Sequence, residues 1–242
     1  MKKTYDSTYI LADIHGNLTK IAQWNRANTN SILIQVGDDG LSDWDLENTS
    51  RRVRDKGNYL MVLKGNHCRT ELFDGRVYND SLELIKDYTV REINGEKFLF
   101  IGGAISLDRA YRKQIKLEKP KIENWYREDE AVYYNPIIET FTDIDVLVTH
   151  TAPRRFIPYL DPIFLKRFTE HDPELIEDLK KEEGVISRIY DTVKANNNLK
   201  TFLFGHWHRY IFTEDRGTIV KCLDIDQIIE HNPKIYEQIV KF

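Results

Sequence analysis

Cysteine and long apolar runs are both scarce in this sequence, and each scarcity excludes a class of protein. Only Cys68 and Cys222 occur, far apart and without metal-type spacing, which argues against a disulfide-stapled scaffold and favours reduced thiols. No apolar stretch approaches the roughly 20 residues that span a bilayer. The first residues, Met1 to Asp6, contain no apolar run typical of a signal peptide. We therefore expect a cytoplasmic protein with no membrane segment.

Positive charge is not in excess either. The chain has 35 Lys and Arg residues against 39 Asp and Glu residues, a formal net charge of -4 at pH 7. This balance argues against binding nucleic acid through overall basicity, although a local basic patch is still allowed. Hydrophobic residues make up 41% of the 242 residues, enough for a sizeable core, so disorder is not expected. One domain over residues 1–242 accounts for the length.

Short apolar runs rich in β-branched residues recur along the chain and predict strands buried on both faces. They cover residues 8–12, 32–36, 59–63, 98–101, 146–149 and 201–204. Helical stretches fall between several of these runs. One follows Asn17, and the clearest begins at Asp172-Pro173 and is weakened in its middle by Gly184. Strands separated by helices predict an α/β fold with its sheet strands packed as layers.

Two features depart from the regular alternation of strands and helices. Residues 210–213 and 218–222 flank Glu214-Asp215-Arg216-Gly217, a pattern that predicts a β-hairpin. The long segments 106–144 and 154–200 lie between predicted core strands. We interpret both segments as cap-like insertions that shape the entrance to a site.

Residues that commonly bind metals gather directly after five of the predicted strands. They are Asp13 and His15, Asp38, Asn66 and His67, His150, and His206 and His208. Five of the seven histidines are in this set; His171 and His231 lie elsewhere, and we interpret them as surface or packing residues. Because ligands of open α/β sheets bind at the carboxyl ends of the strands, the set is expected to meet at one edge.

The chemistry of this set indicates a transition metal. Imidazole and carboxylate together suit Mn, Fe or Zn better than Ca, which prefers an all-oxygen shell. After Gly205 the backbone can turn, which would let His206 and His208 each reach a different ion.

These motifs, in this order, resemble the calcineurin-like metallophosphoesterase superfamily. The motifs are Asp13-Ile14-His15, Gly37-Asp38, Gly65-Asn66-His67, His150 and Gly205-His206-Trp207-His208, and they span residues 13–208. The resemblance implies an α/β fold of four layers, an α/β/β/α sandwich with the metals at the strand ends. It also implies hydrolysis of a phosphoester with two divalent metal ions, Mn first, with Fe, Zn or Ni as alternatives.

The same resemblance divides the ligands between two ions. Asp13, His15, Asp38 and His208 would hold one ion, and Asp38 would bridge to a second ion held also by Asn66, His150 and His206. The ion pair would activate a bridging water for in-line attack on phosphorus. His67 would be the catalytic residue, contacting the phosphate and protonating the leaving oxygen, a contribution of about 10²–10⁴-fold.

Two positions depart from the family pattern. Members often read Gly-Asp-x-x-Asp around the bridging aspartate, and the second carboxylate often orients the catalytic histidine, but Leu41 stands in its place. Asp39 or Asp43 could substitute for it. Cys68 follows His67 where Glu or Asp is common. Neither position is a metal ligand, so the expected metal binding is unaffected while the support of His67 is open.

Candidates for substrate binding lie beside the predicted ligands. Gly102-Gly103-Ala104 would allow the backbone to approach the metal site closely, and the stretch from there to Arg109 looks like one in some bacterial and phage members. Arg109 either reaches the substrate phosphate or pairs with Asp108. Arg154, just past His150, is a second candidate, and Asn66 is expected to contact the substrate as well as the metal. Four aromatic residues either pack or form a stacking wall for a nucleobase: Trp125, Tyr126, Tyr133 and Tyr134.

Three functions are compatible with the sequence. Hydrolysis of a phosphate monoester, in a phosphoprotein or a small metabolite, is favoured by the arginines beside the ligands. A phosphodiesterase or nuclease acting on nucleotides or nucleic acid is the alternative, suggested by Lys and Arg between residues 109 and 121 and by the nearby aromatics. A metal-binding scaffold without turnover rests only on Leu41 and Cys68. Nothing in the sequence indicates an obligate protein partner.

Overall fold

Two six-stranded sheets form the centre of the computed structural model, which describes residues 4–119, 130–158 and 160–232. The strands of the first sheet are β1 (Thr8–Leu11), β2 (Ile32–Gln35), β3 (Tyr59–Val62), β4 (Val77–Tyr78), β5 (Leu82–Leu84) and β12 (Ile228–His231). Those of the second are β6 (Thr89–Ile93), β7 (Glu96–Ile101), β8 (Val146–Thr149), β9 (Thr201–Phe204), β10 (Ile211–Asp215) and β11 (Thr218–Cys222).

The two sheets have the same plan. Their strand orders are β12-β1-β2-β3-β5-β4 and β10-β11-β9-β8-β7-β6. In each sheet the four inner strands are parallel and both edge strands are antiparallel to their neighbours. The inner strands of one sheet therefore all end at the same edge.

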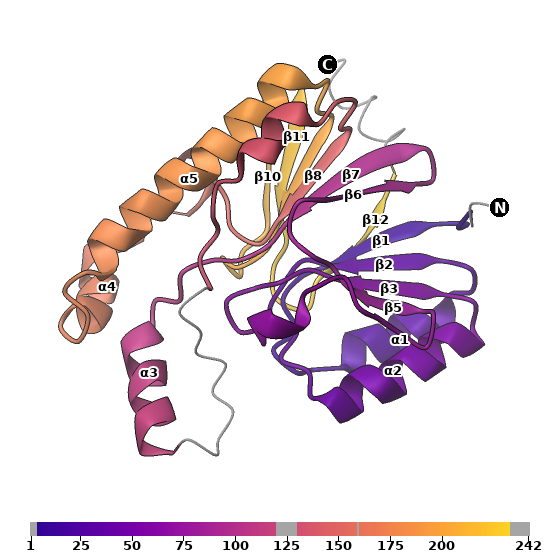
Figure 1. The fold of residues 1–242 in the computed structure, drawn as a ribbon, viewed down its shortest axis with the longest axis horizontal. Helices are drawn as coiled ribbons and strands as arrows, with labels where there is room; N and C mark the ends of the chain where they lie inside the picture. The colour runs from indigo at the N-terminus through magenta and orange to yellow at the C-terminus, as the bar shows by residue number, and fades with distance from the viewer. Residues whose placement is uncertain (1–3, 120–129, 159, 233–242) are drawn as a thin grey trace.

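Helices cover the outer faces of both sheets, as Figure 1 shows. The helices are α1 (Thr19–Ala27), α2 (Asp43–Asp55), α3 (Arg109–Glu118), α4 (Pro162–Thr169) and α5 (Leu175–Asn196), of which α1, α2 and α5 cover the sheets. α1 and α2 lie on the first sheet, where Trp24 and Leu46 pack with Leu33 of β2. α5 lies on the second sheet, where Ile189 packs with Leu147 of β8.

Alternation along the strands fills the space between the sheets. Ile32 and Ile34 point toward the second sheet and join a core cluster with Phe98 and Phe100 of β7, while Leu33 between them faces the helices. Successive strand side chains point to opposite faces, so strands that are apolar at every position fit between two layers. The predicted four-layer α/β/β/α sandwich is confirmed.

The six strands predicted from apolar runs and the predicted hairpin are all present. Residues 216 and 217 connect β10 to β11, and Arg216 and Gly217 have φ of 47° and 83°. Positive φ at both loop residues is typical of the tight turn whose twist matches that of a hairpin.

The clearest predicted helix differs from the structure in two ways. α5 begins at Leu175 rather than at Pro173, because the Asp172 carboxylate binds Arg109 and does not cap the helix. Gly184 does not break it, since α5 runs unbroken for 22 residues.

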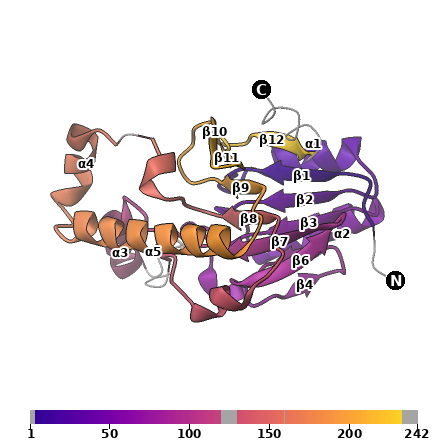
Figure 2. The ribbon, with the colours of Figure 1, turned by 90° about the horizontal axis from the view of Figure 1, so that it is seen from above.

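Only parts of the segments 106–144 and 154–200, which were predicted to be cap-like insertions, lie outside the core. α5 supplies the outer layer of the second sheet through buried residues such as Ile186 and Val193, whereas α3 and α4 extend beyond the sheets (Figure 2). Their function as caps stays a prediction. Within the described ranges no helix is long and apolar enough to cross a membrane.

Candidate metal centre

The candidate ligands lie in the loops that follow β1, β2, β3, β8 and β9, and contacts between the two sheets bring them together. The backbone N–H of His206, after β9, donates to both oxygens of Asp13, after β1, at 3.2 and 3.0 Å. Asn66, after β3, places Oδ1 2.9 Å from Nε2 of His150, after β8. The structure therefore gathers at one rim all seven residues predicted as ligands.

The metal-binding atoms form groups that share members. Asp13, His15 and His208 form one group, His15, Asp38 and His67 a second, and Asp38, His150 and His206 a third; within each, one candidate atom per residue lies within 4.8 Å of the others. Asp38 therefore stands between the two groups that were expected to hold separate ions. His206 and His208, two residues apart, belong to different groups.

The close approach of hydrogen-bond acceptors indicates where cations fit. Nδ1 of His150 lies 2.8 Å from the Val36 carbonyl and donates its hydrogen there, so in the neutral ring Nε2 carries a lone pair. That lone pair faces Asn66 Oδ1 at 2.9 Å and Asp38 Oδ1 at 3.4 Å. Two such acceptors need a proton or a metal ion between them. His15 Nε2 and His208 Nε2 lie 3.1 Å apart, where one ion can bind both. The donor set and its convergence fit two divalent metal ions.

The pKa values of neighbouring groups in the cluster are shifted in opposite directions. Burial raises the pKa of Asp38, but the surrounding histidines, His150 first, outweigh it and hold that pKa well below its ordinary value. Burial lowers the pKa of His150, but Asp38 outweighs burial and raises it to about 9. Burial holds the pKa of His206 well below its ordinary value. Asp38 is thus an anion buried among imidazoles, which suits a shared cation ligand.

The backbone at these loops is strained. Four of the seven candidate ligands have positive φ, namely His15 (43°), Asp38 (55°), His206 (67°) and His208 (48°). Each such non-glycine residue costs on the order of 1–3 kcal/mol and persists where surrounding structure imposes it, commonly at functional sites. The turn expected at Gly205 is made by the two histidines that follow it. Gly205 itself provides space, since a Cβ there would collide with the Asp13 carboxylate.

Sequence comparison agrees with this geometry. The model of the calcineurin-like phosphoesterase family matches residues 7–210. The chain belongs to this family. Comparison with curated proteins finds no significant match.

Two solved structures are similar in fold to this calcineurin-like phosphoesterase but have low sequence identity to it. A phosphopantetheinyl hydrolase from Mycobacterium tuberculosis is 13% identical, with 96% of this chain and 92% of that chain covered and a TM-score of 0.45. A candidate 5′-nucleotidase from Staphylococcus aureus, in complex with alpha-ketoglutarate, is 15% identical, with 93% and 50% covered and a TM-score of 0.41. Neither likeness carries an argument about the substrate here.

His67, the predicted catalytic residue, lies in the site with its backbone fixed to Asp38. Its N–H donates to Asp38 Oδ1 at 2.7 Å, and its ring meets the His15 ring edge-on at 5.0 Å between centroids. Burial lowers the pKa of His67, while the carboxylates of Asp38 and Asp108 raise it. Among the described residues, none makes a hydrogen bond to the His67 ring.

The proposed substitutes for the missing carboxylate at Leu41 bond to other groups. Leu41 is buried in the core beneath α2 together with Cys68. Asp39 accepts the N–H of Leu41 at 2.8 Å, and Asp43 is exposed and pairs with Arg69 at 3.0 Å. Neither carboxylate is hydrogen-bonded to His67 among the described residues, and support of His67 by Asp39 or Asp43 stays a prediction. Outside the ligand set, the Asp108 carboxylate raises the pKa of His67.

The two arginines predicted to bind substrate are engaged elsewhere. Arg109, at the start of α3, pairs with Asp172 at 2.5 Å and with Asp178 of α5 at 2.8 Å, instead of with Asp108. Arg154 is half-exposed and contacts the Pro158 carbonyl at 3.4 Å. Arg109 thus ties α3 to α5, and contact of either arginine with substrate stays a prediction.

A buried polar network behind Asn66 was not predicted. Arg112 donates to the Asn66 carbonyl from both terminal nitrogens at 3.2 Å, and Asn66 Nδ2 donates to Ser106 Oγ at 2.8 Å. Glu130 accepts the Ser106 hydroxyl at 3.1 Å. The Gly102-Gly103 pair makes room for this approach, because a Cβ on Gly102 would collide with the Lys64 carbonyl. The only sequence signal for this network was that Ser106 and Arg112 closely follow the Gly102-Gly103 pair.

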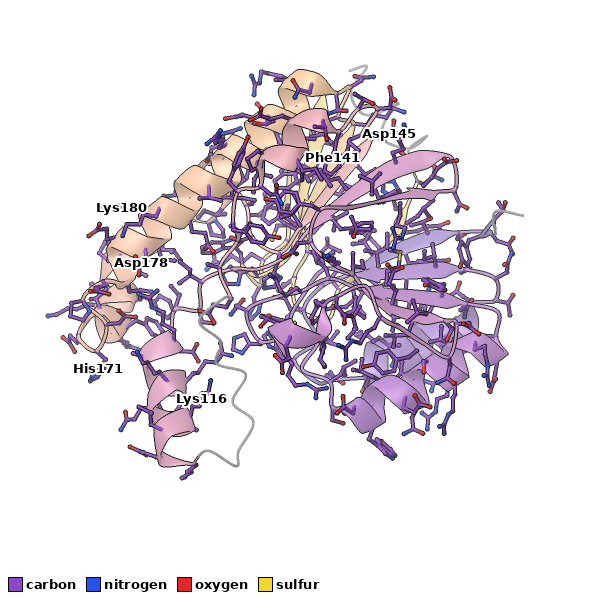
Figure 3. All side chains as sticks on the ribbon, viewed as in Figure 1. Lys116, Phe141, Asp145, His171, Asp178 and Lys180 are labelled. Carbon is purple, nitrogen blue, oxygen red and sulfur yellow. The ribbon has the colours of Figure 1, made fainter. Side chains whose placement is uncertain are left out.

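A cavity of about 690 Å³ opens between α3 and α5. Its wall includes Arg109, Lys113, Glu130, His171 and Glu182, from both predicted cap segments. Figure 3 labels His171 and Asp178 at this junction and Lys116 on α3.

The remaining aromatic and histidine predictions have separate outcomes. Tyr133 is half-exposed. The guanidinium carbon of Arg188 lies 3.7 Å from the centre of the Tyr134 ring, so Tyr134 packs against Arg188. Trp125 and Tyr126 lie outside the described residues. His231 is buried against Glu96 at 3.0 Å, as a packing residue would be.

Proposed function

We propose that this chain is a dinuclear metal-dependent phosphatase that hydrolyses a phosphate monoester of a phosphoprotein or small metabolite. The observation that carries the proposal is the place of Asp38. Its carboxylate is 1% exposed and belongs to candidate ligand groups on both sides, one with His15 and His67 and one with His150 and His206. A buried carboxylate shared in this way suits a bridge between two cations.

The chain's own residues then have separate roles. Asp13, His15 and His208 would hold one ion, Asn66, His150 and His206 the other, and Asp38 both. When bound, paired divalent ions lower the pKa of a bridging water and neutralise charge on phosphate oxygens. We assign His67 as the proton donor to the leaving oxygen. Burial lowers its pKa, and the negative charge of a bound phosphoryl group would raise it again.

The surroundings of the ligands favour a phosphate monoester over a nucleic-acid polymer. Among the described residues, Arg112 is the guanidinium that bonds to a candidate ligand residue, and it is 4% exposed and hydrogen-bonded inside the protein. A nuclease would need cations spread along an exposed strip. The observation that favours this alternative is α3, on which Lys113 and Lys116 are exposed. Phosphodiester hydrolysis is therefore the second candidate.

Rates with p-nitrophenyl phosphate and bis-p-nitrophenyl phosphate separate these functions. The two substrates are compared with Mn²⁺ and with chelator, in the wild type, Asp38→Asn and the control Asp43→Asn, whose carboxylate is 75% exposed. We expect metal-dependent turnover, faster on the monoester, lost in Asp38→Asn and kept in Asp43→Asn. Turnover of the diester alone would favour the second candidate. Two bound ions without turnover of either substrate would favour the non-catalytic scaffold.

A further inference from the structure

Asn66 differs from the other candidate ligands in one respect. Its carboxamide has an oxygen that can bind a metal ion and an NH₂ group that cannot, and the two orientations have nearly the same shape. A half-turn of the amide would therefore remove this ligand without disturbing the fold. The surrounding structure must decide which atom faces His150.

The hydroxyl of Ser106 makes that decision. It has one hydrogen to donate and two lone pairs to accept with. At pH 8, the pH of the titration below, Glu130 is ionised and can only accept, so the hydrogen goes to Glu130 Oε2 at 3.1 Å. Arg112 can only donate, and its Nη1 occupies one lone pair. The second lone pair faces the Asn66 amide at 2.8 Å and selects its NH₂ group, which turns Oδ1 toward His150.

These three residues are themselves held firmly. Ser106, Glu130 and Arg112 are 1%, 4% and 4% exposed. Glu130 Oε1 accepts the Ser106 N–H at 2.8 Å, and the Glu130 carbonyl accepts the N–H of Ala104 at 2.9 Å. Arg112 also grips the Asn66 carbonyl. Because these contacts fix the donors and acceptors around the Ser106 hydroxyl, the Asn66 amide has one favoured orientation.

We propose that Ser106, Glu130 and Arg112 are positioning residues that hold the oxygen of Asn66 toward the metal position formed with Asp38, His150 and His206. They thereby set the affinity of that position, while the position at Asp13, His15 and His208 is independent of them. The inference rests on the proposed function, because it takes Asn66 as a metal ligand. Partners of metal ligands commonly change metal affinity by about 10–100-fold when removed.

Two variants break the chain of hydrogen bonds at different points. Ser106→Ala removes the hydroxyl. Glu130→Gln keeps the shape of the side chain, but its oxygen is needed by the Ser106 N–H, so its NH₂ meets the hydroxyl and reverses the donor order. Ser81→Ala is the matched control, because Ser81 is also 1% exposed and its hydroxyl donates to the Ser50 carbonyl at 2.6 Å, away from the metal centre.

The experiment is a Mn²⁺ titration of each full-length protein at pH 8 by calorimetry, with unfolding temperatures measured in parallel. We expect two ions in the wild type and in Ser81→Ala. In Ser106→Ala and Glu130→Gln one position weakens by about 10–100-fold and the other keeps its affinity. An unchanged affinity at both positions in these two variants overturns the inference.

A second arm separates orientation from simple loss of packing. Asn66→Asp presents oxygen on both sides of the side chain, so amide orientation no longer matters. In that background Ser106→Ala should cause no further weakening, and an equal weakening would contradict the inference. Two bound ions without any phosphoester turnover would defeat the proposed function alone. Phosphoester turnover in the wild type, together with unchanged Mn²⁺ affinities in Ser106→Ala and Glu130→Gln, would defeat the positioning alone. A wild type that binds no Mn²⁺ would defeat both.

Discussion

Glu182, a buried acid within α5, should make the protein less stable as the pH rises. Its oxygens accept the N–H groups of Ile105 at 3.1 Å and Val132 at 3.2 Å, and only 7% of the residue is exposed. Burial raises the pKa of Glu182 from 4.5 to about 7. The folded protein therefore keeps a proton that the unfolded chain has already lost. Its contribution to stability is full below pH 4.5 and is lost as the pH rises through about 7.

The size of the effect follows from that pKa. Ionising this buried carboxyl at pH 8 costs the folded state about 3 kcal/mol more than it costs the unfolded chain. Between pH 5 and pH 8 the change is about 2 kcal/mol. Glu182→Gln removes this pH-dependent change. It also leaves one of the two backbone N–H groups facing an NH₂ group, which costs the folded state about 1–3 kcal/mol. The variant should be less stable than the wild type at pH 5 and should recover most of this deficit by pH 8.

Urea unfolding from pH 5 to pH 8 in the presence of chelator measures both curves. Burial also raises the pKa of Glu130 to about 7, so Glu182→Gln should flatten the pH dependence without abolishing it. Glu177→Gln, one turn earlier on α5 and 75% exposed, is the control and should follow the wild type. Parallel curves for the wild type and Glu182→Gln would refute the reasoning.

Three further predictions concern the metal centre. His67→Asn should lower kcat about 10²–10⁴-fold on alkyl phosphates, where leaving-group protonation matters, and a normal Mn²⁺ content would separate this from ligand loss. Asp108→Asn removes a charge that raises the pKa of His67, so the alkaline decline of kcat should move to lower pH; an unmoved pH profile would exclude Asp108. Gly205→Ala should displace the Asp13 carboxylate and abolish binding of one ion. Gly184→Ala, in open space on α5, should instead raise the free energy of unfolding by about 0.5–1 kcal/mol, and denaturant titration of both variants checks this contrast.

The core strands and the gathering of ligands were predictable because both depend on local sequence. Six apolar runs mark strands that are covered on both faces, and the residue just past such a strand must lie at its carboxyl end. The sequence did not predict β4, β5, β6 and β12, because none of them is a continuous apolar run of that length. β6 and β12 are edge strands with exposed polar residues such as Arg91 and Glu230, and β5 has only three residues.

The supports of the site were not predictable because they join residues far apart in the chain. Arg109 pairs with Asp172, 63 positions away, and this pairing also removes the cap that Asp172-Pro173 had suggested for α5. Ser106 contacts Asn66 from 40 positions away. Such polar partners leave no periodic pattern, and only the folded backbone decides which of several nearby acids each cation meets.

The most direct test of the dinuclear centre is the Mn²⁺ spectrum of the protein by electron paramagnetic resonance, with the bound metal counted. We predict two Mn²⁺ ions per chain in the wild type with the signal of a magnetically coupled pair, because Asp38 shares one group with His15 and His67 and another with His150 and His206. Asp38→Asn should lose the coupling. A single uncoupled ion in the wild type, or a coupled pair that survives in Asp38→Asn, would contradict the shared carboxylate on which the account depends.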